Sequence, residues 1–149
     1  MSAVVIVSLV LLLGTPCRAH PEETEQVPGL RWELFKPDRI EWKDGPPSLL
    51  PGAKMAILEG DPSKEGFFTM RIKMPDGYRV LPHWHPRTER LTIIQGVVNL
   101  GTGDRLDGGA TEPLSAGTYS SMPPKMVHFA WMKGETILQL SSIGPWEVV

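Results

Sequence analysis

The chain has 149 residues, a length typical of one domain, and 15 basic against 17 acidic side chains leave a formal net charge of −2. That balance excludes a broad nucleic-acid-binding surface, which needs an excess of lysine and arginine. Hydrophobic residues make up 41% of the chain, as in folded globular proteins, and 15 glycines with 15 prolines disfavour both a helical bundle and a doubly wound α/β domain.

The N-terminal segment has the pattern of a secretory signal. Residues 3–13 are almost entirely apolar, but this run is too short to span a bilayer comfortably. Small side chains at Cys17 and Ala19 suit cleavage after Ala19, although no basic residue precedes the apolar run. We therefore expect residues 1–19 to be a signal peptide. A buried strand, a membrane anchor and a misplaced start codon are the alternatives.

Cleavage there would remove Cys17, the only cysteine of the chain. Residues 20–149 would then have neither disulfides nor thiolate metal ligands. Because residues 14–16 fit a lipoprotein signal poorly, we expect no stable membrane association after cleavage. These features are compatible with a periplasmic or secreted protein that is held together by a packed core.

The segment after the signal is expected to be an irregular arm. Residues 20–30 are polar and acidic, and residues 31–53 contain four prolines, which prevent a long helix. The predicted organisation is a signal peptide at 1–19, an N-terminal arm at 20–53 and a β domain at 54–149.

From residue 54 onward the chain has the pattern of an all-β domain. Residues 54–59 are predicted to form a strand. In the next strand, apolar and polar side chains alternate with a period of two, and the apolar ones are Phe68, Met70, Ile72 and Met74. Further strands are predicted at residues 79–85, 91–95, 97–100, 118–122, 127–131 and 136–141, with a loop at 101–109. Short strands at this spacing indicate a sandwich or a closed barrel.

Three of the four histidines lie in these strands and carry the candidate chemistry. His83 and His85 are two residues apart, so both imidazoles project from the same face of a strand. Residues 86–88 supply a bend after which Glu89 can return to the same point, and barrel closure can bring His128 beside them. Three imidazoles and a carboxylate suit a divalent iron, manganese, nickel, copper or zinc ion. The structural alternative is a set of hydrogen-bonded strand histidines without a metal.

The spacing of these residues resembles the two signatures of the cupin superfamily. The first signature is matched by Gly77, His83, His85, Glu89 and Gly96, and the second by Gly117, Pro123 and His128. In the second signature, Lys125 and Met132 stand where the family has glycine and asparagine. The resemblance covers about residues 54–142 and is closest to small single-domain microbial cupins.

The resemblance implies an antiparallel jelly-roll barrel with one metal ion bound inside it. By carry-over from the signatures, the ligands are His83, His85, Glu89 and His128. Iron or manganese is the first expectation, and nickel, copper or zinc are the alternatives. Gly77 would permit the turn into the first ligand strand, and Gly96 would end the second strand at a tight turn.

Strand parity predicts the neighbours of the ligands. A mostly apolar wall with a few polar groups would form a pocket for a small molecule, with a plain barrel core as the alternative. The residues expected to line this pocket are Arg79, Leu81, Gln95, Met126 and Ala130. Trp84, Phe129 and Trp131 have the opposite parity, and we expect them to face a second sheet, the arm or a second subunit. Because dimers formed between sheets are common among cupins, the resemblance implies a homodimer, with packing of the arm as the alternative.

Two functions follow from the resemblance. Dioxygenases that act on enolic or phenolic compounds are frequent among cupins with this ligand set, and Glu89 would then be the catalytic general base. The second function is a non-catalytic module that binds or senses a metal or a small ligand. No further acid or base partner can be named from the sequence, which favours the binding module, but the enzyme is the preferred hypothesis.

Overall fold

The computed structural model describes residues 32–149. The predicted signal peptide and the first part of the predicted arm, residues 20–31, lie outside the described residues. The chain separates into two units, Met1–Glu33 and Leu34–Val149, and the second contains every described strand. No helix within residues 32–149 has the length and hydrophobicity needed to cross a membrane.

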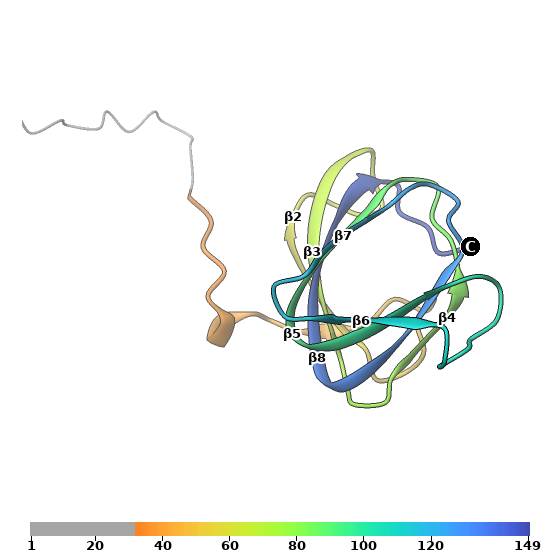
Figure 1. The fold of residues 1–149 in the computed structure, drawn as a ribbon. Helices are drawn as coiled ribbons and strands as arrows, with labels where there is room; N and C mark the ends of the chain where they lie inside the picture. Colours follow the sequence, from red (N-terminus) through yellow and green to blue (C-terminus); the bar gives the residue numbers. More distant parts are fainter. Residues whose placement is uncertain (1–31) are drawn as a thin grey trace, which may run out of the picture. The chain divides into compact units, whose positions relative to one another are not determined.

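Eight strands and one short 3-10 helix make up the second unit. In chain order they are η1 (Pro37–Arg39), β1 (Lys43–Asp44), β2 (Lys54–Glu59), β3 (Gly66–Met74), β4 (Arg79–His83), β5 (Glu89–Thr102), β6 (Thr111–Ser115), β7 (Tyr119–Met122) and β8 (His128–Gly144). All pairs are antiparallel, and the order is β1-β2-β3-β8-β5-β6, with β4 added to β8 and β7 to β5. The strands curve around a common interior, so the predicted all-β jelly-roll architecture is confirmed (Figure 1).

Two long strands connect the two layers of this structure. The first part of β8 pairs with β4 and its later part pairs with β3, while β5 pairs first with β7 and then with β6. The strands β5 and β8 also pair with each other along most of their length, with register shifts between Ile93 and Val97. One layer therefore contains β1, β2, β3 and β7, the other contains β4 and β6, and β5 and β8 belong to both.

The sequence analysis predicted that two strands would end at positions where the structure has continuous strands. Residues 91–95 and 97–100 were expected to be separate, but both lie in β5, and Gly96 lies inside this strand at a bulge with φ +75°. Residues 127–131 and 136–141 likewise belong to the single strand β8. A bulge accommodates an extra residue and bends a strand without ending the ladder, and for this reason a glycine here does not terminate pairing.

One strand, β6, was not predicted. It contains Pro113, which cannot donate a ladder hydrogen bond. Because β6 pairs only with β5, it is an edge strand, where proline is tolerated.

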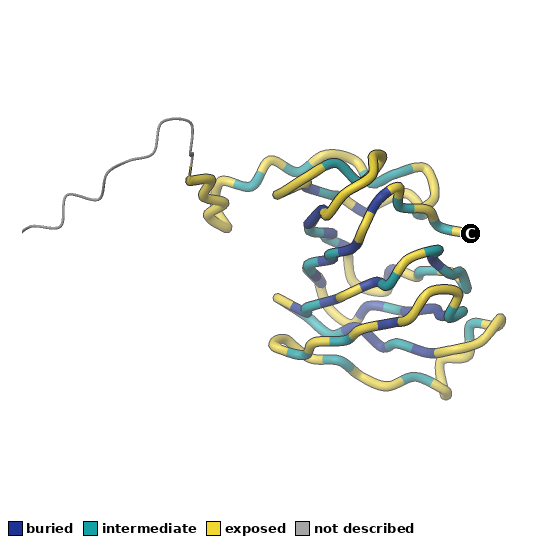
Figure 2. Tube along the Cα trace, turned by 90° about the horizontal axis from the view of Figure 1, so that it is seen from above, coloured by how far each residue is buried: buried dark blue, intermediate teal, exposed yellow. Residues whose placement is uncertain are grey.

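The inward faces of the strands form the hydrophobic core. The four apolar residues that the alternation placed inward, Phe68, Met70, Ile72 and Met74, are at most 5% exposed, as predicted for that strand. Further core residues come mainly from β5 and β8, and they are Leu91, Ile93, Val98, Met132, Leu138 and Leu140. Figure 2 shows buried positions alternating with exposed ones along the strands, as a half-buried sheet requires.

Candidate metal centre

Strand pairing brings four metal-ligand side chains to one point inside the barrel. His83 ends β4, and Glu89 begins β5. His85 lies in the segment between them, because the strand predicted at residues 79–85 ends at His83. His128 begins β8 and is the direct cross-strand partner of His83. The late histidine therefore joins the early pair because β4 and β8 are neighbours, as barrel closure requires.

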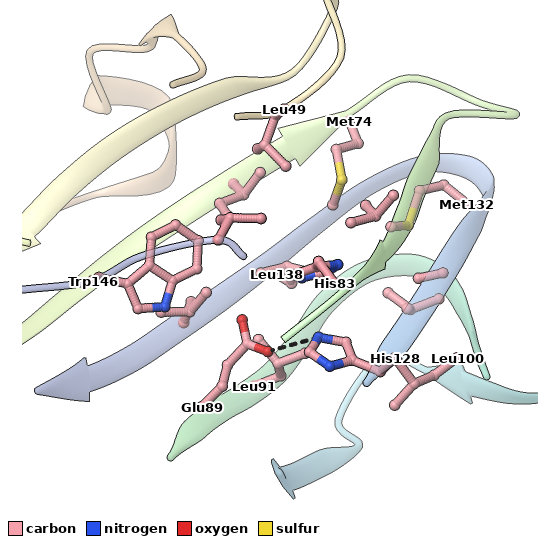
Figure 3. Close-up of a pocket in the computed structure, with 16 residues that line it drawn as sticks. Leu49, Met74, His83, Glu89, Leu91, Leu100, His128, Met132, Leu138 and Trp146 are labelled. Carbon is pink, nitrogen blue, oxygen red and sulfur yellow. Dashed lines mark ion pairs between the residues drawn. The ribbon is translucent and has the colours of Figure 1, made fainter. Parts of the chain in front are cut away.

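The ligand atoms of these side chains face one another at short distances. The Nε2 atoms of His83 and His85 are 3.1 Å apart, and the three histidines together offer ligand atoms within 4.8 Å. Glu89 Oε2 lies 3.4 Å from His85 Nε2 and 3.3 Å from His128 Nε2, the latter contact being the dashed line in Figure 3. All four side chains therefore surround a common centre.

Backbone carbonyls orient all three imidazoles. Each Nδ1–H donates to a carbonyl oxygen, which assigns the tautomer and leaves the Nε2 lone pair directed at the centre. The pairs are His83 with Leu81 at 2.7 Å, His85 with Glu147 at 2.7 Å and His128 with Met126 at 2.9 Å. Lone pairs and a carboxylate that face each other repel, so the arrangement demands a positive charge at the centre.

The protonation of the cluster is consistent with such a charge. Burial alone disfavours charge on Glu89, but His128 and His85 outweigh burial and lower the pKa of Glu89 to about 2. Burial also opposes charge on His128, yet the carboxylate of Glu89 raises the pKa of His128 above its usual value. Burial lowers the pKa of His83 to about 4, which keeps this ring neutral. The buried Glu89 carboxylate therefore favours a positive charge beside it, which a metal ion at the centre would supply.

One buried carboxylate oxygen indicates directly that these residues can hold a metal ion. Glu89 is 5% exposed, and within the described residues its Oε2 has no partner at hydrogen-bonding geometry. Its contacts to the two histidines are longer than the 2.7–2.9 Å typical of charge-assisted hydrogen bonds. Three imidazole nitrogens and one carboxylate oxygen form a donor set that suits divalent first-row transition metals. The residues present therefore fit the metal that the resemblance implies.

The centre opens on a small apolar cavity of about 50 Å³. His83, Glu89 and His128 supply most of its polar wall, and Figure 3 shows them among aliphatic and thioether side chains. Ala130 lines this cavity, as predicted by parity. The other apolar residues of the wall are Leu49, Ile72, Met74, Val80, Leu91, Val98, Leu100, Met132, Leu138, Leu140 and Val148.

Two residues that parity placed in this pocket lie elsewhere because β4 is irregular. Its pairing with β8 shifts register between Val80 and His83, so the face that carries Val80 points inward. Leu81 is consequently 54% exposed, and Arg79 is exposed as well. The prediction that Arg79 and Leu81 share the face of the histidines is therefore corrected.

The other two residues that were expected in the pocket, Gln95 and Met126, also lie outside the cavity. The register of β5 shifts on both sides of Gln95, which turns its side chain outward, where its amide donates to the Glu135 carbonyl at 3.3 Å. Met126 precedes β8 and packs against the core, and its carbonyl, rather than its side chain, contacts His128. Neither Gln95 nor Met126 lines the cavity.

The aromatic residues of opposite parity have different surroundings. Phe129 is 1% exposed and packs inside this chain, where a Cβ added to Gly101 would overlap its ring. Trp84 and Trp131 are half-buried. The packing of Phe129 therefore needs no second subunit, and the homodimer stays a prediction.

Sequence reasoning missed the contribution of residues 145–149. Trp146 stacks on the His85 ring with centroids 4.7 Å apart and planes at 20°, and the Glu147 carbonyl accepts the His85 proton. The backbones of Trp84 and Val149 exchange two hydrogen bonds of 3.0 Å. No strand pattern or ligand spacing marks this tail in the sequence, since its role depends on long-range contacts.

A bound metal should stabilise the protein measurably. An ion that binds only the folded state at 100 times its Kd contributes about 2.7 kcal/mol, which for a domain of this size raises Tm by roughly 10 °C. We expect this rise when Fe²⁺, Mn²⁺ or Zn²⁺ is added to chelator-treated protein, and reversal by excess chelator. Thermal unfolding followed by circular dichroism measures it, with Mg²⁺ as the control ion. Equal Tm values with and without every transition metal would contradict the site.

Known structures share this fold. An RmlC-like cupin from Shewanella frigidimarina NCIMB 400 is 17% identical, with a TM-score of 0.59 over 77% of this chain and 94% of that one. An acetylacetone dioxygenase from Acinetobacter johnsonii is 13% identical, with a TM-score of 0.61 over 84% and 81%. The polyketide cyclase RemF from Streptomyces resistomycificus is 15% identical, with a TM-score of 0.58 over 80% and 86%.

Comparison with curated proteins finds no match. The family model described as Domain of unknown function (DUF4437) matches residues 26–149, which is most of the chain. The fold is that of the cupins, in agreement with the two signatures in the sequence. The chain therefore belongs to the DUF4437 family and has the cupin fold.

Proposed function

We propose that this protein is a metal-dependent, dioxygenase-like enzyme that acts on a small enolic substrate, with an enolisable β-diketone as the leading candidate. The observation that carries the proposal is the convergence of three oriented histidines and a buried glutamate on a small apolar cavity. One of the proteins with a similar fold is an acetylacetone dioxygenase, which supports the substrate class.

The size and lining of the cavity restrict the substrate. One water needs about 10–15 Å³ of such space, so a cavity of about 50 Å³ favours a compact substrate over a bulky one. Apart from the metal-site groups and Trp146, the lining side chains are aliphatic or thioether. Short alkyl groups are accommodated by such a wall, whereas the hydroxyl groups of a sugar would lose hydrogen bonds there.

The chain's own residues have definable roles in this reaction. A bound metal of this ligand set would supply Lewis acidity and, for iron or manganese, access to O₂ chemistry. His83, His85 and His128 hold their Nε2 atoms toward the centre, and the apolar wall excludes bulk water. Glu89 carries the only carboxylate in the described cavity wall, so we assign it the role of catalytic base. Because its pKa is low, the enolisable substrate whose proton it takes would have to be made more acidic by the bound metal.

The proposal is tested by metal analysis and oxygen uptake on the same preparation. Protein loaded with Fe²⁺ should contain one metal ion per chain and consume O₂ with acetylacetone, and more slowly with larger catechols or flavonols. Glu89→Gln should lower kcat by about 100-fold or more, because general-base catalysis typically contributes that much. Glu112→Gln alters an exposed glutamate on β6 and is the matched control, expected to retain activity.

The alternative function gives a different result in the same experiment. A non-catalytic cupin that binds or senses a ligand would hold one metal ion per chain and consume no O₂ with any compound of the panel. Export to the periplasm or the medium belongs to our proposal as well, and it is supported by the sequence of residues 1–19 alone.

A further inference from the structure

We propose that Trp146 is a specificity-determining residue, whose indole N–H donates a hydrogen bond to an oxygen atom of the small ligand in the cavity. The inference rests on the proposed function to the extent that both place an oxygen-bearing ligand beside the histidines. It deepens that function, since it names the group of this chain that recognises an oxygen atom of the ligand.

The first observation is an unused donor. Trp146 lines the cavity, and its Nε1 atom is buried without any hydrogen-bond partner among residues 32–149. Buried N–H groups are paired in the great majority of cases, and an unpaired one costs about 1–3 kcal/mol. Because Trp146 belongs to the wall of the cavity, a ligand there is the candidate partner for this unpaired donor.

The second observation is that the indole is held in place. Its ring stacks on His85, and it meets Phe68 edge to face with centroids 6.4 Å apart. The Trp146 backbone N–H donates to the Pro62 carbonyl at 2.7 Å. An aromatic ring fixed on two sides and anchored by its backbone directs its N–H without the loss of side-chain entropy that a flexible donor would incur on binding.

The third observation is the polarity of the remaining wall. The Nδ1 protons of His83 and His128 are used by backbone carbonyls, so these rings offer acceptors to the interior, and Glu89 also offers an acceptor. In the absence of a positive charge at the centre, the described lining therefore contains one available donor, the indole N–H of Trp146. The matching ligand carries a carbonyl or enolate oxygen that accepts this bond, with small apolar groups around it.

Trp146 also lies next to the metal site. His85, on which the indole stacks, is 3.4 Å from the Glu89 carboxylate, and Figure 3 shows Trp146 and Glu89 in the wall of the same cavity. A small molecule held by the metal ligands is therefore within the reach of the tryptophan.

A matched pair of substitutions tests the inference. Trp146→Phe keeps an aromatic ring against His85 and removes the donor. Trp131→Phe removes another indole N–H that is buried without a partner in residues 32–149 but does not line this cavity. Both variants and the parent protein are loaded with Zn²⁺, which prevents turnover, and the Kd of acetylacetone is measured by calorimetry.

We expect Trp146→Phe to raise the Kd of acetylacetone about 3- to 10-fold, the loss that corresponds to one net hydrogen bond. Its Zn²⁺ affinity should stay within about twofold of the parent, and Trp131→Phe should leave both constants unchanged. A Trp146→Phe protein that binds acetylacetone as tightly as the parent overturns the inference, as does a zinc-loaded parent protein that does not bind acetylacetone.

A measurement on the unsubstituted protein covers the case in which Trp146→Phe does not fold. Acetylacetone should shift the indole ¹H–¹⁵N resonance of Trp146 and leave that of Trp131 in place, and an unmoved Trp146 resonance overturns the inference. The proposed function fails separately: if acetylacetone binds and the Trp146 resonance shifts, but the iron-loaded protein consumes no O₂, the inference stands and the enzyme hypothesis is wrong.

Discussion

His128→Ala is expected to lower the affinity for a divalent transition metal by more than about 100-fold, because loss of even an indirect contact to a metal ligand costs 10- to 100-fold. His128 is one of three imidazoles at the centre and is the group that brings β8 into the site. Its removal also leaves the buried Glu89 carboxylate without one of its two charge partners. Competition against a fluorescent chelator measures the Kd, and dialysis followed by elemental analysis measures the metal content.

Asn99→Ala is the control for this substitution. Asn99 is also a buried polar residue on a strand paired with β8, and it contacts the Trp131 carbonyl rather than the metal site. Its removal should lower stability by about 1 kcal/mol, the value of one hydrogen bond, and leave metal affinity intact. Retention of metal by His128→Ala within tenfold of the parent would show that the other side chains suffice, and the three-histidine site would be wrong.

Gly96→Ala is expected to lower the free energy of unfolding by about 3 kcal/mol, through backbone strain and overpacking together. Gly96 has φ +75°, a conformation that disfavours alanine, and an added Cβ would overlap the Thr136 hydroxyl and lie 2.7 Å from the Glu135 carbonyl oxygen. The strand β8 cannot withdraw there without disturbing its own pairing with β3. Urea unfolding at equilibrium measures the loss.

Gly77→Ala separates strain from crowding. Gly77 has nearly the same φ, +72°, but an added Cβ would meet no atom within 4 Å. Only the backbone strain remains in this variant, so its free energy of unfolding should fall by about 1 kcal/mol. If the free energy of unfolding fell equally in the two variants, the close approach of Gly96 to β8 would not contribute to the loss, and the prediction would be wrong.

The sequence predicted those features that depend on local pattern. The alternation in β3 is visible because apolar side chains point into the core at every second position, and the spacing of His83 and His85 indicates a pair of ligands. The position of His128 could be anticipated only from the resemblance, because no local sequence pattern in β8 indicates that β4 is its neighbour.

The features that failed depend on register and on distant contacts. Arg79 and Leu81 were assigned by a parity that a single irregularity in β4 reverses, because one inserted residue moves every later side chain to the other face. Gly96 was interpreted as a strand end because a glycine at a bulge and a glycine at a turn are alike in sequence. The role of Trp146 could not be predicted because its partner His85 lies 61 positions earlier in the sequence.

The carbonyl of Glu147 has a consequence for the order of events during biosynthesis. His85 receives its orientation from Glu147, which lies 62 positions later in the sequence, and Trp84 is paired with Val149. A nascent chain in which residues 145–149 have not yet left the ribosome lacks the acceptor that sets the imidazole tautomer. We therefore expect the histidines to be fully oriented for metal binding only after residues 145–149 have been synthesised.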